Sequence, residues 1–222
     1  MDLKNLKGIE IKEGNVIKLE DSFDNILFDI KKIIPIDLGL SVQWANCNVG
    51  TTLPYESGLY FQWGDTKGWT KEDIEQGNKS FNFDSYKFTN DSGKTFNKYK
   101  EKGLFLEPED DAVTVNMGDE WRMPTEDETN ELLKLSRKWV NKNGINGYEF
   151  TGKNGKKLFI PATGYVKDNT INSENSEGLV WTSNICSGNV KQGKLFYFYN
   201  GGGQNFCLLD RSYGLTIRGV KK

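Results

Sequence analysis

Histidine is absent from the 222 residues of the chain. Without it, Ser-His-Asp and Cys-His nucleophilic centres, HExxH zinc sites and the two-histidine iron triad are all excluded. Any catalysis would have to use carboxylates, lysine, tyrosine or cysteine. We therefore expect a protein that is not an enzyme.

Cysteine is scarce as well. The three cysteines, Cys47, Cys186 and Cys207, are widely spaced and odd in number, which argues against a disulfide framework and against a thiolate metal cluster. Cys186 and Cys207 would be able to bridge in an oxidising environment, but the sequence favours buried free thiols. We predict no bound metal and no cofactor.

The chain has neither an excess of basic residues nor a long apolar run. Its 29 basic and 31 acidic residues are interspersed and give a net charge of −2, so no basic stripe is present to track nucleic-acid phosphates. No run approaches the roughly 18 apolar residues of a membrane helix, and the N-terminal "MDLKNLKGIEIKEGNV" lacks the apolar segment of a signal peptide. We expect synthesis in a cytoplasm and no insertion into a membrane.

The length and the 36% hydrophobic content suit one domain plus an appendage. In residues 1–34, the short β-like runs Ile9–Ile11, Val16–Leu19 and Ile26–Ile30 are separated by turn residues, which predicts a three-stranded meander. Such a piece is too small to be stable alone. Either its strands extend the main sheet, or it is an arm for oligomerisation or anchoring.

The stretch "WRMPTEDETNELL", residues 121–133, is acidic and predicts the start of a helix. Thr125 and Glu128 have the spacing of a capping box, and the other acidic residues of the first turn face the positive end of the helix dipole. Apolar residues at three- and four-residue spacing predict that the helix continues through Trp139 and ends at Gly144. These carboxylates are therefore interpreted as helix-forming rather than catalytic.

The remaining segments predict short strands and long loops. Apolar residues at period two from Leu38 to Trp44 predict a strand, and about 50 residues up to Asp119 show little periodicity. In Leu195–Tyr199 every residue is apolar or aromatic, so alternation does not show which side chains face the core; Gly201–Gly203 predicts a hairpin tip. In "YGLTIRGV", residues 213–220, apolar and polar residues alternate as in a half-buried strand.

Six phrases follow one another along the chain: "IDLGLSVQWANCNVG", "GLYFQWGDT", "EPEDDAVTVNMGDEWRMPTEDETNELL", "GYEFTGKNGKKLFIPATGY", "GLVWTSN" and "YGLTIRGV". As an ordered set they resemble the Fibrobacter succinogenes major paralogous domain, a group abundant in Bacteroidota and their phages and similar to the C-type lectin-like fold. The resemblance covers about residues 36–220. It implies an α+β fold, in which a C-type lectin-like domain with long loops and paired N- and C-terminal strands occupies residues 35–222 and the β-rich N-terminal arm occupies residues 1–34.

The resemblance also implies a role. In similar proteins the C-terminal strands and loops display a ligand surface, which maps here between Trp181 and Arg218. Group members in Bacteroidota commonly begin with a secretion signal, whereas this chain begins with the arm. We therefore expect a phage virion component, a head or tail fibre or a decoration protein, with a cytoplasmic location as the alternative. The arm would bind other virion proteins or form a homodimer or homotrimer.

Aromatic and polar residues of the loops are the candidate ligand-binding residues. Aromatic faces stack on pyranose rings, while amides and carboxylates bind the hydroxyls, so a host-surface or mucosal glycan is a fitting ligand beside a protein receptor. Trp63, Tyr86 and the Tyr197/Tyr199 pair are also aromatic candidates, and the alternative is that such residues build the core. We assign four tryptophans to the core: Trp44, Trp121, Trp139 and Trp181. The residues selected for the ligand site are Trp69, Tyr199, Asn200, Gln204, Asn205 and Asp210.

The acidic segment Glu107–Asp111 has two interpretations. Its oxygens suit calcium, but the spacing is not that of an EF-hand, and the sequence favours carboxylates that cap backbone amides.

Three functions stay open at this point. The leading one is a binding or decoration protein, and the second is a structural virion assembly protein without an external ligand. The third is an enzyme of the formylglycine-generating type, which depends on nearby cysteines. The 21 positions between Cys186 and Cys207 give that third function little support.

Overall fold

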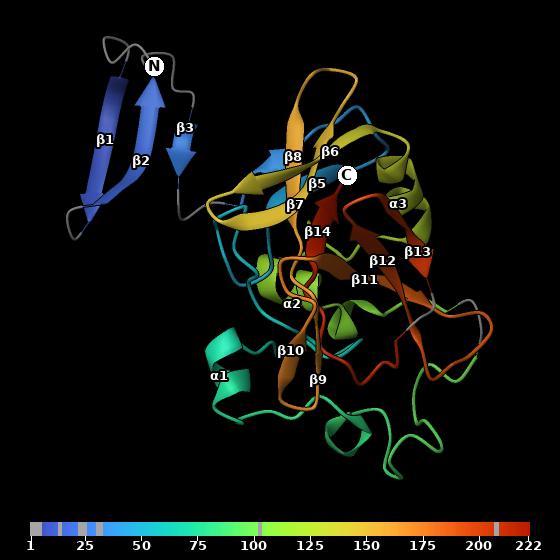
Figure 1. Ribbon diagram of the computed structural model, residues 1–222. Coiled ribbons are helices and arrows are strands. Elements are labelled where there is room, and N and C mark those ends of the chain that lie inside the picture. The colour runs from blue at the N-terminus through green and yellow to red at the C-terminus, as the bar shows by residue number, and fades with distance from the viewer. Residues whose placement is uncertain (1–5, 13–14, 22–25, 30–32, 102–103, 207–208) are drawn as a thin grey trace. The chain divides into compact units, whose positions relative to one another are not determined.

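The computed structural model describes the chain except for residues 1–5, 13–14, 22–25, 30–32, 102–103 and 207–208 (Figure 1). The chain divides into two compact units, Met1–Ile34 and Pro35–Lys222. Strands account for 38% and helices for 14% of the structure, so it is sheet-dominated and compatible with an α+β fold. Among the described residues, every helix is too short or too polar to cross a bilayer.

The N-terminal unit is a three-stranded antiparallel sheet, which confirms the predicted meander. Its strands are β1 (Leu6–Lys12), β2 (Asn15–Asp21) and β3 (Ile26–Asp29), in the order β1-β2-β3. The turn residues Gly14, Asp24 and Asn25 lie outside the described residues.

The two ends of the second unit meet in one sheet. It has the order β14-β5-β4 and consists of β4 (Pro35–Ile36), β5 (Gln43–Asn48) and β14 (Arg218–Lys221). The strand predicted over Leu38–Trp44 begins only at Gln43. The Asp37 carboxylate accepts the Gly39 amide at 2.8 Å, and Gly39 has a φ of +72°, so the chain turns before β5. Leu38 and Val42 are buried nonetheless.

The predicted capping box is confirmed, but the predicted helix length is wrong. Helix α3 (Glu126–Leu133) is capped reciprocally by Thr125 and Glu128. The chain then enters β6 (Ser136–Lys142), which forms a sheet with β7 (Ile145–Thr151) and β8 (Lys157–Pro161). Trp139 therefore lies on a strand, opposite Tyr148, and contacts that ring edge-on at 5.4 Å. Gly144 belongs to the β6–β7 turn, with a φ of +86°, rather than to a helix end.

A further sheet lies against α3. It has the order β11-β12-β13 and consists of β11 (Glu177–Ile185), β12 (Gly193–Tyr199) and β13 (Gly202–Phe206). At the other end of this unit, α1 (Lys71–Glu75) lies beside the hairpin of β9 (Tyr165–Lys167) and β10 (Thr170–Asn172) (Figure 1). In the long segment between β5 and α3, the described residues form α1, α2 (Ala112–Met117) and two 3-10 turns and are otherwise largely irregular, as the weak periodicity indicated.

The core brings α3 together with the sheets of the second unit. One buried cluster includes Leu132 from α3, Phe150 from β7, Phe196 and Phe198 from β12, and Val220 from β14. The prediction that residues 213–220 form a half-buried strand is wrong, because Thr216 and Arg218 are fully buried too.

Arg218 is buried, and no described carboxylate forms an ion pair with it. Its guanidinium donates to Asn48 Oδ1 at 2.9 Å, to the Ala45 carbonyl at 3.0 Å and to the Phe159 carbonyl at 3.2 Å. Burial lowers the pKa of Arg218 to about 10, so the side chain is charged at neutral pH. The arginine thereby joins β14 to β5 and β8 inside the core.

Candidate functional site

The hairpin between β12 and β13 forms the exposed end of the β11-β12-β13 sheet. Tyr199 pairs with Gly202, so the turn consists of Asn200 and Gly201 alone. Gly201 has a φ of +133°, which L side chains rarely adopt, and Asn-Gly is the preferred pair for such a two-residue turn. The predicted hairpin tip is thus confirmed, with its turn one residue earlier than Gly201–Gly203.

The two faces of β12 differ in chemistry. Phe196 and Phe198 are fully buried on the core side, whereas Tyr197 is half-buried and Tyr199 is 43% exposed. Glu177 lies opposite Tyr199 on β11, and Gln204 lies opposite Tyr197 on β13, so these side chains share the outer face. We call this surface the hairpin face and define it as Glu177, Tyr197, Tyr199, Asn200 and Gln204.

Glycine backbone supports the Tyr199 ring. A Cβ atom at Gly202 would lie 3.3 Å from the Tyr199 hydroxyl oxygen, and one at Gly201 would lie 3.4 Å from the ring carbon Cε2. The ring therefore lies over the backbone of the turn. The Tyr148 hydroxyl donates to the Tyr199 carbonyl at 2.9 Å, which ties this end of the hairpin to β7.

Tyr197 stands between the ring of Tyr199 and a carboxylate. The Tyr197 and Tyr199 ring centroids are 5.6 Å apart, and the Tyr197 hydroxyl donates to Glu177 Oε1 at 2.9 Å. Burial, and then the hydrogen bond to Glu177, raises the pKa of Tyr197 to about 12. Gln204 is exposed beside this pair. The hairpin face thus combines apolar ring surface with a carboxylate and two primary amides.

The other selected residues lie elsewhere or are only partly described. Trp69 packs against a second cluster containing Tyr60, and the Lys67 ammonium lies 4.1 Å from its ring centroid. Asp210 pairs with Gln192, the residue before β12. Gln192 is seven residues, or about 20 Å along the strand, from Tyr199, so Asp210 lies away from the hairpin face. For Asn205 only the backbone pairing with Phe196 is described.

Several aromatic and cysteine interpretations need correction. Trp63 and Tyr86 are buried, so neither is a platform for a ligand. The Trp63 Nε1–H donates to the Thr182 carbonyl, and the Tyr86 hydroxyl donates to the Trp63 carbonyl.

Cys47 is a buried free thiol as expected, but Cys186 is in a disulfide, which contradicts the prediction of a free thiol there. Cys207 lies outside the described residues.

The acidic segment before α2 is satisfied by protein groups. Asp111 caps α2 by accepting the Val113 and Thr114 amides at 2.9 and 3.0 Å, as predicted. Glu107, Glu109 and Asp110 lie close enough to hold a cation, but the Lys98 ammonium is within 2.5, 3.4 and 2.6 Å of them respectively. Lysine thus supplies the positive charge that calcium would otherwise bring.

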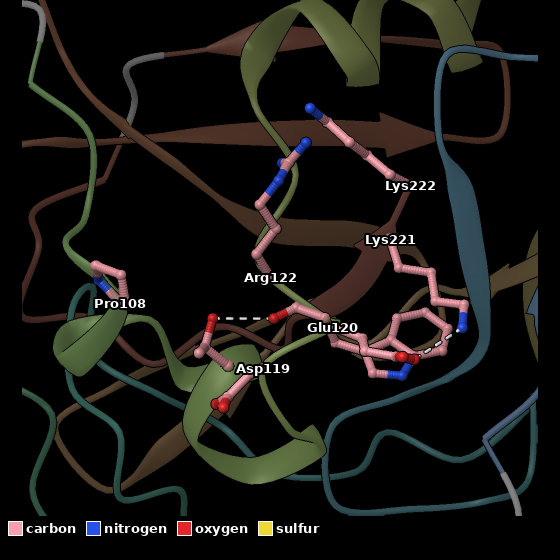
Figure 2. A pocket seen from close by; sticks show the side chains of 8 residues that line it. Pro108, Asp119, Glu120, Arg122, Lys221 and Lys222 are labelled. Carbon is pink, nitrogen blue, oxygen red and sulfur yellow. Dashed lines mark hydrogen bonds and ion pairs between the residues drawn. The ribbon is translucent and has the colours of Figure 1, made fainter.

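A pocket of about 460 Å³ lies beside Trp121 and the C-terminus (Figure 2). Its charges largely pair within the protein: Lys221 binds Glu120 at 3.1 Å, and Arg122 binds Glu128 at 2.5 Å. Thr114 donates its hydroxyl proton to the Trp121 carbonyl at 2.9 Å. Glu120, Arg122 and Lys221 are therefore already engaged by protein groups.

No protein-family model, curated protein or solved structure matches the chain. The interpretation of the hairpin face therefore depends on its own geometry.

Sequence reasoning missed Glu177, because only the register that pairs Glu177 with Tyr199 brings this carboxylate to the aromatic pair. The Asn-Gly dipeptide indicates the register of β12 with β13, but it carries no signal for the register of β11 with β12 that brings in Glu177.

Proposed function

We propose that the chain is a non-enzymatic binding protein that contacts a saccharide through the hairpin face. The observation that carries this proposal is the Tyr199 ring, which lies over Gly201 and Gly202 and is 43% exposed. A ring held in this way offers a flat apolar surface to the C–H face of a pyranose. Because the turn already restricts the ring, binding costs little side-chain entropy.

The polar groups around Tyr199 suit sugar hydroxyls, which both donate and accept hydrogen bonds. Glu177 supplies acceptor oxygens, and the amides of Asn200 and Gln204 supply donors and acceptors. Tyr148 holds the backbone of the hairpin end through its hydrogen bond to Tyr199, so these groups are positioned before a ligand arrives. A protein receptor is the alternative ligand class.

The same proposal includes a C-type lectin-like arrangement and a place on a phage particle. Support for the arrangement comes from the ordered phrases quoted above, from the pairing of β5 with β14 and from the long irregular segment between β5 and α3. Residues 1–34 form a small sheet with strands of four to seven residues, which suits an attachment or self-association element. We propose that this unit contacts other virion proteins or copies of itself.

A glycan array tests the binding function. We expect the full chain to bind a subset of bacterial-surface or mucin-type glycans, and Tyr199→Ala to weaken that binding about tenfold or more, as loss of a stacking ring does. The matched control is Phe105→Ala, which removes an aromatic ring that is 52% exposed and pairs with Asn184 near the other end of β11. Equal binding by Tyr199→Ala and wild type, or no binding to any glycan, would contradict the proposal.

A further inference from the structure

A second pocket lies near the end of β12 opposite the hairpin face. Its volume is about 460 Å³, and the segment of residues 94–100 and the loop of residues 189–191 enclose it. Three lysines line it together with Phe96 and Asn189: Lys94, Lys100 and Lys191. We call it the basic pocket.

The basic pocket is lined by hydrogen-bond donors. All three lysines are exposed, and none forms an ion pair with a described residue. Asn189 Oδ1 already accepts the Lys191 amide at 3.0 Å, which leaves the Asn189 NH₂ group to donate into the pocket. None of the described residues that line the pocket is acidic. A wall of ammonium and amide donors matches a group that only accepts, which is an oxyanion.

A buried positive charge lies directly behind this wall. Arg211 is fully buried, and its guanidinium carbon is 3.8 Å from the ring centroid of Phe96, which lines the pocket. Nη1 donates to the Tyr99 carbonyl at 3.2 Å, but Nε and Nη2 have no hydrogen-bond partner in the part of the chain that the structure describes. The Arg211 amide donates to the Lys191 carbonyl at 2.8 Å, which connects the arginine to the pocket loop.

The nearby carboxylates do not cancel this charge. Asp91 accepts the Thr95 amide at 2.8 Å, the Thr95 hydroxyl at 2.7 Å and the Thr89 hydroxyl at 2.8 Å, so its oxygens are already occupied. Asp210 is half-buried and interacts with both Lys191 and Lys167. The three lysines and Arg211 supply four positive charges against the carboxylates of Asp91, Asp210 and the exposed Glu101, which follows Lys100 in the chain, so the field in the pocket favours an anion.

We propose that the basic pocket binds a sulfate or phosphate group. Such a group presents three or four acceptor oxygens, which is enough to accept from all three lysines and from Asn189 at once. The group would be a free ion or a substituent on a sugar, and the inference does not depend on the hairpin face.

Titration of the full chain at low ionic strength tests the proposal. Sodium sulfate, sodium phosphate, galactose 6-sulfate and neutral galactose are added separately, with sodium chloride as the ionic-strength control, and amide NMR shifts or heat are measured. At the amides of the basic pocket, we expect saturable shifts with the sulfate- or phosphate-bearing probes and none with galactose or chloride; shifts confined to the hairpin face would report the proposed saccharide site instead. Tighter binding of galactose 6-sulfate than of free sulfate identifies a sugar substituent, and the reverse order identifies a free ion.

A pair of triple variants separates a built site from general surface charge. Replacing Lys94, Lys100 and Lys191 with glutamine should weaken binding by about tenfold or more. The control replaces Lys138, Lys153 and Lys156, three exposed lysines outside the basic pocket, and so makes the same change in net charge. The control should bind as wild type does. Thermal melts establish that both triple variants fold. Equal weakening in the two triple variants, or shifts that chloride reproduces, would overturn the proposal.

Discussion

Replacing Glu128 with alanine removes three hydrogen bonds at the start of α3. The carboxylate accepts the Thr125 amide at 2.8 Å, and its two oxygens accept from Arg122 at 2.9 and 2.5 Å. The Glu128 side chain is 11% exposed and that of Arg122 is 35% exposed. The substitution therefore leaves the partly desolvated Thr125 amide without its side-chain acceptor, and it leaves the Arg122 guanidinium with the Met123 carbonyl at 3.0 Å as its remaining acceptor.

The expected loss of stability follows from these contacts. Loss of a cap costs about 0.5–2 kcal/mol, and a partly exposed ion pair contributes about 1 kcal/mol, so Glu128→Ala should lower the free energy of unfolding by about 1.5–3 kcal/mol. Asp127→Ala is the matched control, because Asp127 is an exposed acid in the same turn and interacts only with the helix dipole. It should cost about 0.5 kcal/mol.

Urea unfolding followed by tryptophan fluorescence measures the difference. All six tryptophans lie in Pro35–Lys222, so the signal reports the unit that contains α3. With a urea slope of about 3 kcal/mol/M, Glu128→Ala should lower the midpoint by about 0.5–1 M. A midpoint equal to that of Asp127→Ala would refute the role given to Glu128.

Protonation gives an independent test of the same residue. Burial opposes ionisation of Glu128, but the hydrogen bonds from Arg122 and Thr125 outweigh it and hold the Glu128 pKa below its usual value. The carboxylate therefore stabilises the fold above the unfolded pKa of about 4.5, and this stabilisation is lost as pH falls through the lower folded pKa. The stability difference between wild type and Glu128→Gln should be constant from about pH 6 to 7 and should shrink progressively as pH falls below the unfolded pKa of about 4.5.

Three further predictions concern the core and the N-terminal unit. Arg218→Met should lower the free energy of unfolding by about 3–5 kcal/mol, because three acceptors lose their donor. Arg211→Met should lower it by about 1 kcal/mol or less, because Nε and Nη2 of Arg211 have no acceptor among the described residues. Urea unfolding of both variants measures the two free energies. Burial raises the pKa of the Cys47 thiol, so peptide mapping should show iodoacetamide labelling of Cys47 only after unfolding, and rapid labelling of the native chain would contradict its burial. Deleting residues 1–34 should convert an oligomer into a monomer in light scattering if this unit mediates self-association, and an unchanged mass would refute that role.

Local chemistry made part of the structure predictable. The capping box of α3 and the Asn-Gly hairpin involve residues close in sequence, and both signals match the structure. The length of α3 was mispredicted because Trp139 fits a helical spacing, while its pairing with Tyr148 on β7 makes it part of a strand. Strand pairing is a contact between segments, and helical periodicity in one segment carries no information about it.

The candidate site was only partly predictable for the same reason. Tyr199, Asn200 and Gln204 follow one another in a hairpin, so the sequence placed them together. Glu177 comes from another strand, and the burial of Trp63 depends on the residues that surround it in the fold. Arg218 resembled an exposed strand residue because its acceptors belong to β5 and β8, far away in the sequence.

The most direct test of the central claim is an NMR titration with ring-labelled tyrosine. The chain has nine tyrosines, and the ligand is the glycan that gives the strongest array signal. The account predicts that the resonances of Tyr197 and Tyr199 shift and saturate, while those of Tyr165 and Tyr213, which stack on each other elsewhere with centroids 6.0 Å apart, do not move. Saturable shifts confined to tyrosines outside the hairpin face would contradict it.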